Sequence, residues 1–257
     1  LDAPIISHCE DTALAGDGLM HEGYWSTDLG LRGIPAQAEE IMVARDILLA
    51  ELTGGKLHLA HLSTAGSVAL LRFARERGIM VTAEATPHHL LLTDEEVKLQ
   101  SYATSTKVNP PLRSQADVEA LRAAVKEGLI GCIATDHAPW SEEEKEQEYA
   151  KAPFGIASLE TAIPIVWDTL VVKGKMNPLE LIARFTTGPA EVLGIEKEKG
   201  FFAVGRTADI TVIDPQMKKA VNANVFYSKG KNTPVDGRAF QGWPVMTIVG
   251  GKIVMRD

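Results

Sequence analysis

Short apolar runs alternate with longer amphipathic segments through the first half of the chain. Runs with the length and polar or glycine boundaries of buried strands occur at residues 4–10, 56–62, 79–85 and 129–134. Between them, apolar residues three and four positions apart predict three helices, which begin at Pro35, at Ser63 or Thr64, and after Ser114. This alternation predicts βα units on a parallel sheet, as in half of an eight-stranded barrel or a small doubly wound sheet.

Glycines mark the ends of these helices, at Gly54-Gly55, Gly78 and Gly128. In the first helix the apolar positions Ile41, Ala44, Leu48 and Leu52 step by three and four along one face. These positions form the apolar face of the expected helix.

The pattern changes in the second half of the chain. Residues 159–172 predict a helix interrupted by Pro164, and Asn177-Pro178 opens another helix with a cap and a first-turn proline. After Gly194, short apolar runs at residues 201–214, 222–227 and 245–255 predict strands separated by turns. We therefore expect a partial barrel over residues 1–194 and a small β-sandwich remnant over residues 195–257.

Composition and charge narrow the functional class. The 257 residues carry a net charge of −8 without a basic run, which argues against a nucleic acid or an anionic membrane as partner. No stretch approaches the ~18 continuous apolar residues of a membrane span, and the start Leu1-Asp2-Ala3-Pro4 does not resemble a signal peptide. Two cysteines form no disulfide framework, which predicts a cytoplasmic protein. Leu1 in place of an initiator methionine suggests the remainder of a longer protein.

Three of the predicted strands end in residues of types that commonly bind metal ions, histidine and aspartate. His8, His61 and Asp136 follow the first, second and fourth strands, and the carboxyl ends of parallel strands share one rim. Two imidazoles and a carboxylate on one rim suit Zn²⁺ or a similar divalent ion. Alone, Asp136 would more often cap the next helix, and a single histidine would more often be a hydrogen-bonded core residue. Their matched positions favour the metal site.

The neighbouring residues receive other interpretations. Cys9 should point away from His8, and His58, three residues before His61, should face the opposite side of its strand and be structural. Glu84, His88 and His89 fit either a second shell around the metal or a polar rim. No G-x-S-x-G elbow is present, and Cys132 sits among apolar neighbours, so nucleophilic catalysis by serine or cysteine lacks support.

Several motifs, read together, resemble the dihydroorotases of the amidohydrolase superfamily. They are His8-Cys9-Glu10-Asp11, Gly30-Leu31-Arg32-Gly33-Ile34-Pro35, His58-Leu59-Ala60-His61-Leu62-Ser63-Thr64, Thr86-Pro87-His88-His89-Leu90, Lys107-Val108-Asn109-Pro110-Pro111-Leu112-Arg113, Ala134-Thr135-Asp136-His137-Ala138-Pro139, Phe154-Gly155-Ile156, Leu159-Glu160-Thr161 and the segment from Val204-Gly205 through Ser228-Lys229-Gly230-Lys231-Asn232-Thr233-Pro234. The resemblance covers essentially the whole chain. Hydantoinases and allantoinases share the metal ligands. The stretches around Thr86-Pro87-His88-His89 and Lys107-Val108-Asn109-Pro110-Pro111 are closer to dihydroorotase than to either.

The resemblance implies a (β/α)₈ barrel with a β-sandwich built from both termini, of which this chain holds about the last four βα units. It implies one or two Zn²⁺ ions, with His8 and His61 at one metal and Asp136 at the other, where Asp136 also acts as general base and acid. By the same resemblance, Asn109 and the Phe154-Gly155 backbone bind substrate. The implied reaction is the reversible cyclisation of N-carbamoyl-L-aspartate to L-dihydroorotate in a cytoplasmic, homo-oligomeric enzyme.

The chain departs from that family in two ways. The His-x-His pair and the bridging Asp or carboxylated Lys are absent, because the chain starts at the equivalent of the fifth strand. Trp140 stands where the family usually has a histidine that contacts substrate. Two alternatives follow: a hydantoinase-like or allantoinase-like hydrolase of another cyclic ureide, and a non-catalytic assembly partner of aspartate transcarbamoylase.

Overall fold

A parallel four-stranded sheet forms the centre of the computed structural model, which describes residues 3–257; Leu1 and Asp2 of the expected barrel segment lie outside the described residues. The strands lie in the order β1 (Ile5–Ser7), β4 (Leu57–Leu59), β5 (Val81–Ala85) and β6 (Cys132–Ile133). All three pairings are parallel. The predicted α/β class with a parallel sheet is therefore confirmed, although each strand is shorter than its apolar run.

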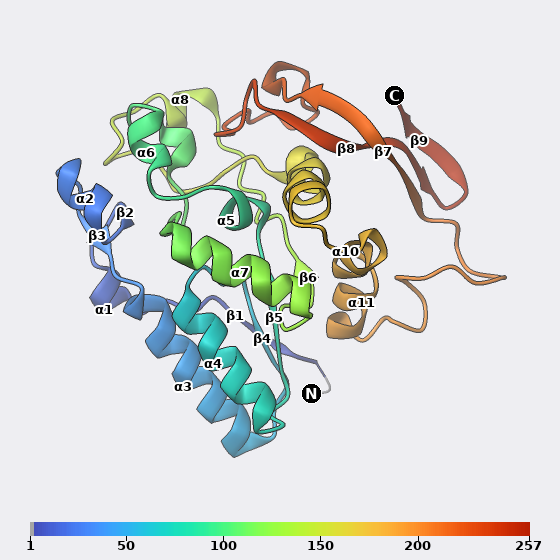
Figure 1. Ribbon diagram of the computed structural model, residues 1–257, viewed down its shortest axis with the longest axis horizontal. Helices are drawn as coiled ribbons and strands as arrows, with labels where there is room; N and C mark the ends of the chain where they lie inside the picture. Colours follow the sequence, from blue (N-terminus) through green and yellow to red (C-terminus); the bar gives the residue numbers. More distant parts are fainter. Residues whose placement is uncertain (1–2) are drawn as a thin grey trace.

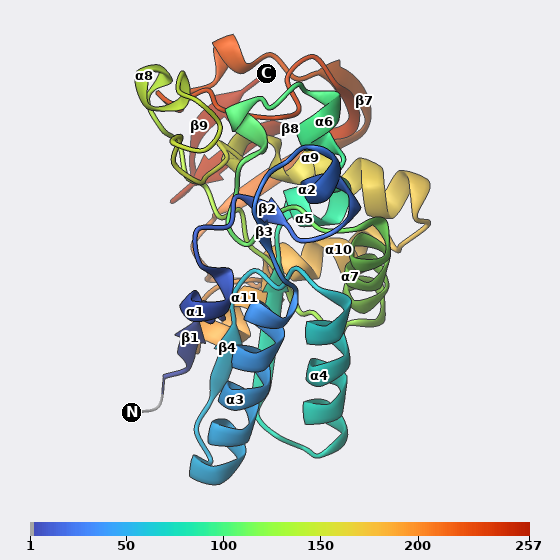
Figure 2. The ribbon, with the colours of Figure 1, turned by 90° about the vertical axis from the view of Figure 1, so that its left-hand side faces the viewer.

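Three helices cover one face of this sheet: α3 (Gln37–Thr53), α4 (Ala65–Glu76) and α7 (Gln115–Glu127), which lie side by side in Figures 1 and 2. Their ends follow from local chemistry. The Thr64 side chain accepts a hydrogen bond from the Ser67 amide, and Ser114 forms a capping box with Asp117. Leu59 and Ala83 of the sheet pack with Val43, Leu71 and Leu121 of the helices in one core.

The apolar face read from α3 turns out to be its outer face. Ile41, Leu48 and Leu52 are 50%, 56% and 80% exposed, whereas Val43 and Ile47 are buried against the sheet. The apolar face of a helix is expected to pack on the core. This helix has two apolar stripes, an exposed one with Ile41 and Leu48 and a buried one with Val43 and Ile47. The sequence locates the helix correctly but assigns the packing to the wrong side.

Excursions of the chain follow the carboxyl ends of the strands. After β1 come α1 (Thr12–Ala15), β2 (Met20–His21), α2 (Tyr24–Asp28) and β3 (Gly33–Ile34), and β2 pairs with β3 in a small parallel sheet. After β5 come α5 (Pro87–Leu91), α6 (Glu96–Leu99) and the 3₁₀ turn η1 (Thr104–Thr106), and after β6 comes α8 (Glu142–Lys145). These excursions build the surroundings of the strand ends.

Residues 159–173 form one continuous helical run of changing pitch. It consists of η2 (Leu159–Thr161), α9 (Ala162–Val166) and the π-helical η3 (Trp167–Lys173). Pro164 lies inside α9 rather than at an interruption. The helix α10 (Pro178–Phe185) begins as predicted, with the Asn177 side chain accepting from the Leu179 amide, and α11 (Thr187–Leu193) follows it.

The C-terminal part forms an antiparallel sheet of β7 (Ile210–Ala220), β8 (Ala239–Val249) and β9 (Lys252–Arg256), seen at the upper right of Figure 1. Two of the expected strands differ here: residues 201–209 are exposed and outside any strand, and the run 222–227 holds the 3₁₀ turn η4 (Ala223–Val225). The run 245–255 is strand on both sides of a turn at Gly250-Gly251, as expected. The Asn222 side chain accepts from the Asn224 amide, a local bond that competes with strand formation.

The C-terminal sheet and the helical run share a core. Phe240 of β8 belongs to the same buried cluster as Ile165 and Trp167. Gly242 lies so close to the Trp167 ring that a side chain at that position would collide with it. No helix within residues 3–257 is both long enough and apolar enough to cross a bilayer.

Candidate active site

Two histidines meet at the carboxyl edge of the parallel sheet. His8 follows β1 and His61 follows β4, and the two strands are paired in register with Ser7 opposite Leu59. His8 Nδ1 lies 3.0 Å from His61 Nε2, and the rings meet edge to face with centroids 4.8 Å apart. The parallel register therefore brings together two residues that are 53 positions apart.

A carboxylate and an amide extend this pair. Glu10 Oε2 lies 3.1 Å from His8 Nε2, and Glu10 Oε1 accepts a hydrogen bond of 3.1 Å from Asn109 Nδ2. A carboxylate that accepts from Nε2–H leaves the lone pair on Nδ1, the nitrogen that faces His61. Glu10 belongs to the His8-Cys9-Glu10-Asp11 motif but has no predicted role; its position two residues after His8 is the sequence signal that points to it.

His61 occupies an unusual position. Its φ of +33° lies in the left-handed region that residues other than glycine seldom adopt. Its amide donates to Glu84 Oε1 over 3.4 Å, and its buried Nδ1 has no hydrogen-bonding partner among residues 3–257. Burial, together with His8, lowers the pKa of His61 below 6.5, against the opposing charge of Asp136 and Glu39. His61 is therefore a neutral imidazole with one unsatisfied ring nitrogen.

Asp136 lies at the end of β6, on the same edge of the sheet. Its φ is +45°, and its charge acts on His61. Next to it, His137 Nδ1 accepts hydrogen bonds from the amides of Ser158 and Leu159, at 3.1 and 3.2 Å. Those bonds hold the segment after Asp136 against residues 158–159. All three predicted ligands thus follow carboxyl ends of parallel strands.

The remaining predicted residues form the wall beside Asn109. Gly155 donates its amide to the Lys107 carbonyl over 2.8 Å. The buried Lys107 ammonium donates to the carbonyls of residues 149, 150 and 152 and lies 4.7 Å from the centre of the Phe154 ring. Trp140 Nε1 donates to the Phe154 carbonyl over 2.8 Å. Asn109, Phe154 and Gly155 are therefore joined through the backbone around Lys107.

The spacing of the two imidazoles suits a zinc ion. Two nitrogens bound at about 2.0–2.1 Å to one tetrahedral ion lie about 3.3 Å apart, close to the 3.0 Å between His8 and His61. The Glu10 contact behind His8 also suits a metal-ligating imidazole, whereas His61 Nδ1, the ring nitrogen that does not face His8, has no such partner among residues 3–257. Within the described range 3–257, however, no group of three or more His, Cys, Asp or Glu side chains is arranged to hold a metal. The two imidazoles therefore suit zinc as two of its ligands, and further ligands would be needed to complete the site.

The two cysteines, His58 and His89 are buried, and both histidines are hydrogen-bonded within the protein. Cys9 and Cys132 are buried free thiols, and burial raises the pKa of each to about 12. His58 is buried, with Nδ1 2.8 Å from Thr82 Oγ1 and Nε2 3.1 Å from Glu84 Oε2. His89 contacts Thr86 and the Pro110 carbonyl, and burial lowers its pKa to about 3.

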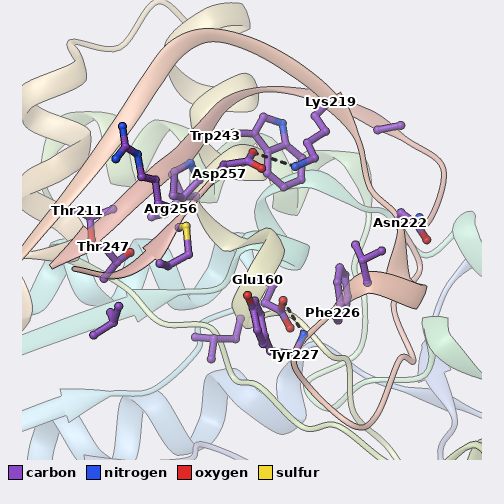
Figure 3. Close-up of a pocket in the computed structure, with 17 residues that line it drawn as sticks. Glu160, Thr211, Lys219, Asn222, Phe226, Tyr227, Trp243, Thr247, Arg256 and Asp257 are labelled. Carbon is purple, nitrogen blue, oxygen red and sulfur yellow. Dashed lines mark hydrogen bonds and ion pairs between the residues drawn. The ribbon is translucent and has the colours of Figure 1, made fainter. Parts of the chain in front are cut away.

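A cavity of about 620 Å³ lies beneath the C-terminal sheet (Figure 3). Trp243, Phe226 and Tyr227 line it, and the Glu160 carboxylate accepts hydrogen bonds from the amides of Tyr227 and Ser228. Its walls include none of the six predicted site residues. The hydrogen-bonded histidine pair at the sheet edge is therefore the better candidate for the active site.

Comparison with known families places the chain. The model described as Amidohydrolase family matches residues 45–254, and the model described as Dihydro-orotase-like matches residues 1–67. The first match covers well over half of the chain. The chain belongs to the amidohydrolase family.

Similar curated proteins agree with the motifs. A dihydroorotase of Pelotomaculum thermopropionicum is 58% identical over 98% of this chain and 58% of its own length, and one of Endomicrobium trichonymphae is 50% identical over 98% of this chain and 59% of its own. The chain thus spans less than two thirds of the length of these relatives. The predicted resemblance to dihydroorotase is confirmed.

Solved structures with the same fold include relatives with other substrates in their names. A dihydropyrimidinase from Brevibacillus agri superposes with a TM-score of 0.88 at 25% identity, over 100% of this chain and 57% of that one. An L-hydantoinase from Arthrobacter aurescens gives 0.87 at 29% identity, over 98% and 57%.

Proposed function

We propose that the protein acts as a metal-dependent cyclic amidohydrolase, a dihydroorotase, which interconverts L-dihydroorotate and N-carbamoyl-L-aspartate in pyrimidine synthesis. The observation that carries this proposal is the similarity to dihydroorotases over 98% of the chain, joined to a histidine pair at the strand-end edge. We place the enzyme in the cytoplasm, as a homo-oligomer, with aspartate transcarbamoylase as a candidate partner.

The proposed architecture is half of a (β/α)₈ barrel over residues 1–194 and a sandwich remnant over residues 195–257. Side chains of Ile6, His58 and Thr82 are in register on the sheet face opposite the helices. Ile6 is 58% exposed and Thr82 is also exposed. A barrel interior is lined in this way, by layers of side chains from adjacent strands.

His8 and His61 are proposed to hold Zn²⁺ through ring nitrogens that are already aimed at a common region. Asp136, on the same edge, is proposed as ligand of a second ion and as the proton-transfer group. Asn109 would bind substrate through its amide, and the Phe154-Gly155 backbone would contact the substrate ring. Bound Zn²⁺ supplies Lewis acidity, which polarises a ring carbonyl and acidifies water.

The residues of this chain account for the proton movements. In hydrolysis Asp136 accepts a proton from the attacking water as its oxygen bonds to the ring carbon. The carbon–nitrogen bond then breaks, and Asp136 returns the proton to the leaving nitrogen. Glu10 keeps His8 in one tautomer throughout, and the Asn109 amide is oriented by the same carboxylate.

The substitution Asp136→Asn tests this proposal in the complete gene product that contains the chain. The amide fills the same space but cannot take up a proton at neutral pH, so we expect folding to persist and turnover of dihydroorotate to fall by about 10²–10⁴-fold. Turnover is measured at matched metal content, with the surface substitution Asp17→Asn as the control. Near-normal turnover with metal bound would rule out Asp136 as the base.

A second candidate is hydrolysis of a hydantoin-like ring. Two observations favour it: the structural likeness to hydantoinases, and the Trp140 indole, whose only N–H is engaged by the Phe154 carbonyl. An indole carries no charge to bind a substrate carboxylate. The same preparation assayed with dihydroorotate and with hydantoin separates the two functions, because the dihydroorotase proposal requires the higher kcat/KM for dihydroorotate.

A further inference from the structure

Two loops of the proposed site meet backbone to backbone. Gly155 has a φ of +143°, and a side chain there would begin 2.7 Å from Ala138 Cβ and 2.8 Å from Trp140 Nε1. Ala138 donates its amide to the Ile156 carbonyl over 3.0 Å. The segment that follows Asp136 and the proposed substrate-binding backbone are therefore packed too closely to admit a side chain between them.

A third segment, residues 228–234 from the C-terminal part, closes against both loops. Gly230 approaches Trp140 so closely that a side chain would collide with the Trp140 carbonyl and lie 2.8 Å from Pro139 Cβ. Asn232 follows two residues later, and its own carbonyl accepts the Ala157 amide over 2.9 Å. The motif that contains Asn232 has no role in the proposed chemistry, yet it reaches the site.

The Asn232 side chain uses both ends of its amide. Oδ1 accepts the Trp140 backbone N–H over 2.9 Å, while Nδ2 donates to the Gly155 carbonyl over 3.0 Å and to the Ala138 carbonyl over 3.3 Å. One acceptor and two donors in a planar group match this side chain only as an amide. A carboxylate in its place would direct an oxygen at two carbonyl oxygens.

We propose that Asn232 is a positioning residue, which sets the spacing between the segment after Asp136 and the Phe154-Gly155 backbone, and thereby the substrate site between them. The positioning itself stands on the hydrogen bonds above; its effect on substrate rests on the proposed function. Asn232 touches no reacting atom and acts through Gly155 and the residues after Asp136.

The test compares Asn232→Asp with Asn224→Asp in the complete gene product. Asn224 lies in η4, is exposed and belongs to the same C-terminal part, so it reports the effect of the added charge alone. Hydrogen exchange is followed in peptides covering residues 136–140 and 153–157, and KM and kcat are measured for dihydroorotate. Asn232→Ser, which replaces the amide by a shorter hydroxyl and adds no charge, removes the same bonds without placing a carboxylate against the carbonyl oxygens.

We expect Asn232→Asp to speed exchange in both peptides by roughly fivefold or more, the factor that one ordinary hydrogen bond implies. KM should rise by roughly tenfold while kcat stays within about threefold, because substrate contacts shift and the proton-transfer group remains. Asn232→Ser should give a smaller change in the same direction, and Asn224→Asp none.

Unchanged exchange in both peptides of Asn232→Asp and Asn232→Ser would overturn the positioning role. Faster exchange with an unchanged KM would overturn the link to substrate. If the unsubstituted protein turns over no dihydroorotate, the proposed function fails by itself, and the exchange measurement still decides whether Asn232 holds the two loops.

Discussion

At the scale of single residues, Glu10 connects the proposed metal ligands to the proposed substrate contacts. Its two carboxylate oxygens contact His8 Nε2 and Asn109 Nδ2, each at 3.1 Å. Such a carboxylate fixes the ring orientation of a ligating histidine and raises its basicity. Glu10 is therefore expected to influence metal affinity without binding the metal itself.

The substitution Glu10→Gln should weaken zinc binding by about 10–100-fold, because the amide no longer provides a charged acceptor behind His8. Zinc affinity of the complete gene product is measured by competition with a chromophoric chelator, which does not depend on turnover. Glu143→Gln, at an exposed position of α8, is the matched control. Equal zinc affinity in Glu10→Gln and the unsubstituted protein would contradict this role.

Sequence reasoning reached the strand-end residues because parallel strands end on a shared edge, which makes position along the chain informative about position in space. His8, His61 and Asp136 all follow that rule. Glu10 also follows β1, two residues after His8, but its second partner, Asn109, is 99 residues away, and Asn232 depends on Trp140, 92 residues away. Their contacts arise only once the excursions after the strands have folded.

At the scale of elements, α3 shows why periodicity alone could not orient a helix. One stripe, with Ile41, Leu48 and Leu52, is exposed, and a second, with Val43 and Ile47, is buried. Both stripes repeat at helical spacing, so the pattern fixes the helix and its end at Gly54 but leaves its rotation open. The rotation is decided by packing of Val43 and Ile47 with Leu57 and Leu59 in the core.

Paired substitutions on α3 distinguish the two stripes. Ile47→Ala should lower the free energy of unfolding by about 2–5 kcal/mol, because it leaves a cavity at a residue that is 1% exposed. Leu48→Ala, next to it and 56% exposed, should change stability by no more than about 0.5 kcal/mol. Urea unfolding followed by circular dichroism measures both. Equal losses in the two variants would mean that the outer stripe is also packed.

At the scale of the whole molecule, the parallel sheet ends on one side in β1, a strand with apolar, accessible side chains. β1 is an edge strand, paired on one side with β4, and its Ile5 and Ile6 are 70% and 58% exposed. The outer stripe of α3 adds further exposed leucines. An unpaired strand edge beside apolar side chains favours association with a second chain. The backbone donors and acceptors then form hydrogen bonds while the apolar side chains are buried.

The polypeptide of residues 1–257, expressed by itself, should therefore self-associate, with a mass that rises with concentration in size-exclusion chromatography with light scattering. Ile6→Lys should shift it toward the monomer, because a lysine on an edge strand opposes pairing with a second chain. Leu179→Lys is the control, since Leu179 is 77% exposed on α10, which packs beside β6 at the opposite end of the sheet from β1, and should leave the association unchanged. A monomeric mass at every concentration would contradict the edge-strand argument, and equal effects of the two lysines would assign the association to general hydrophobicity.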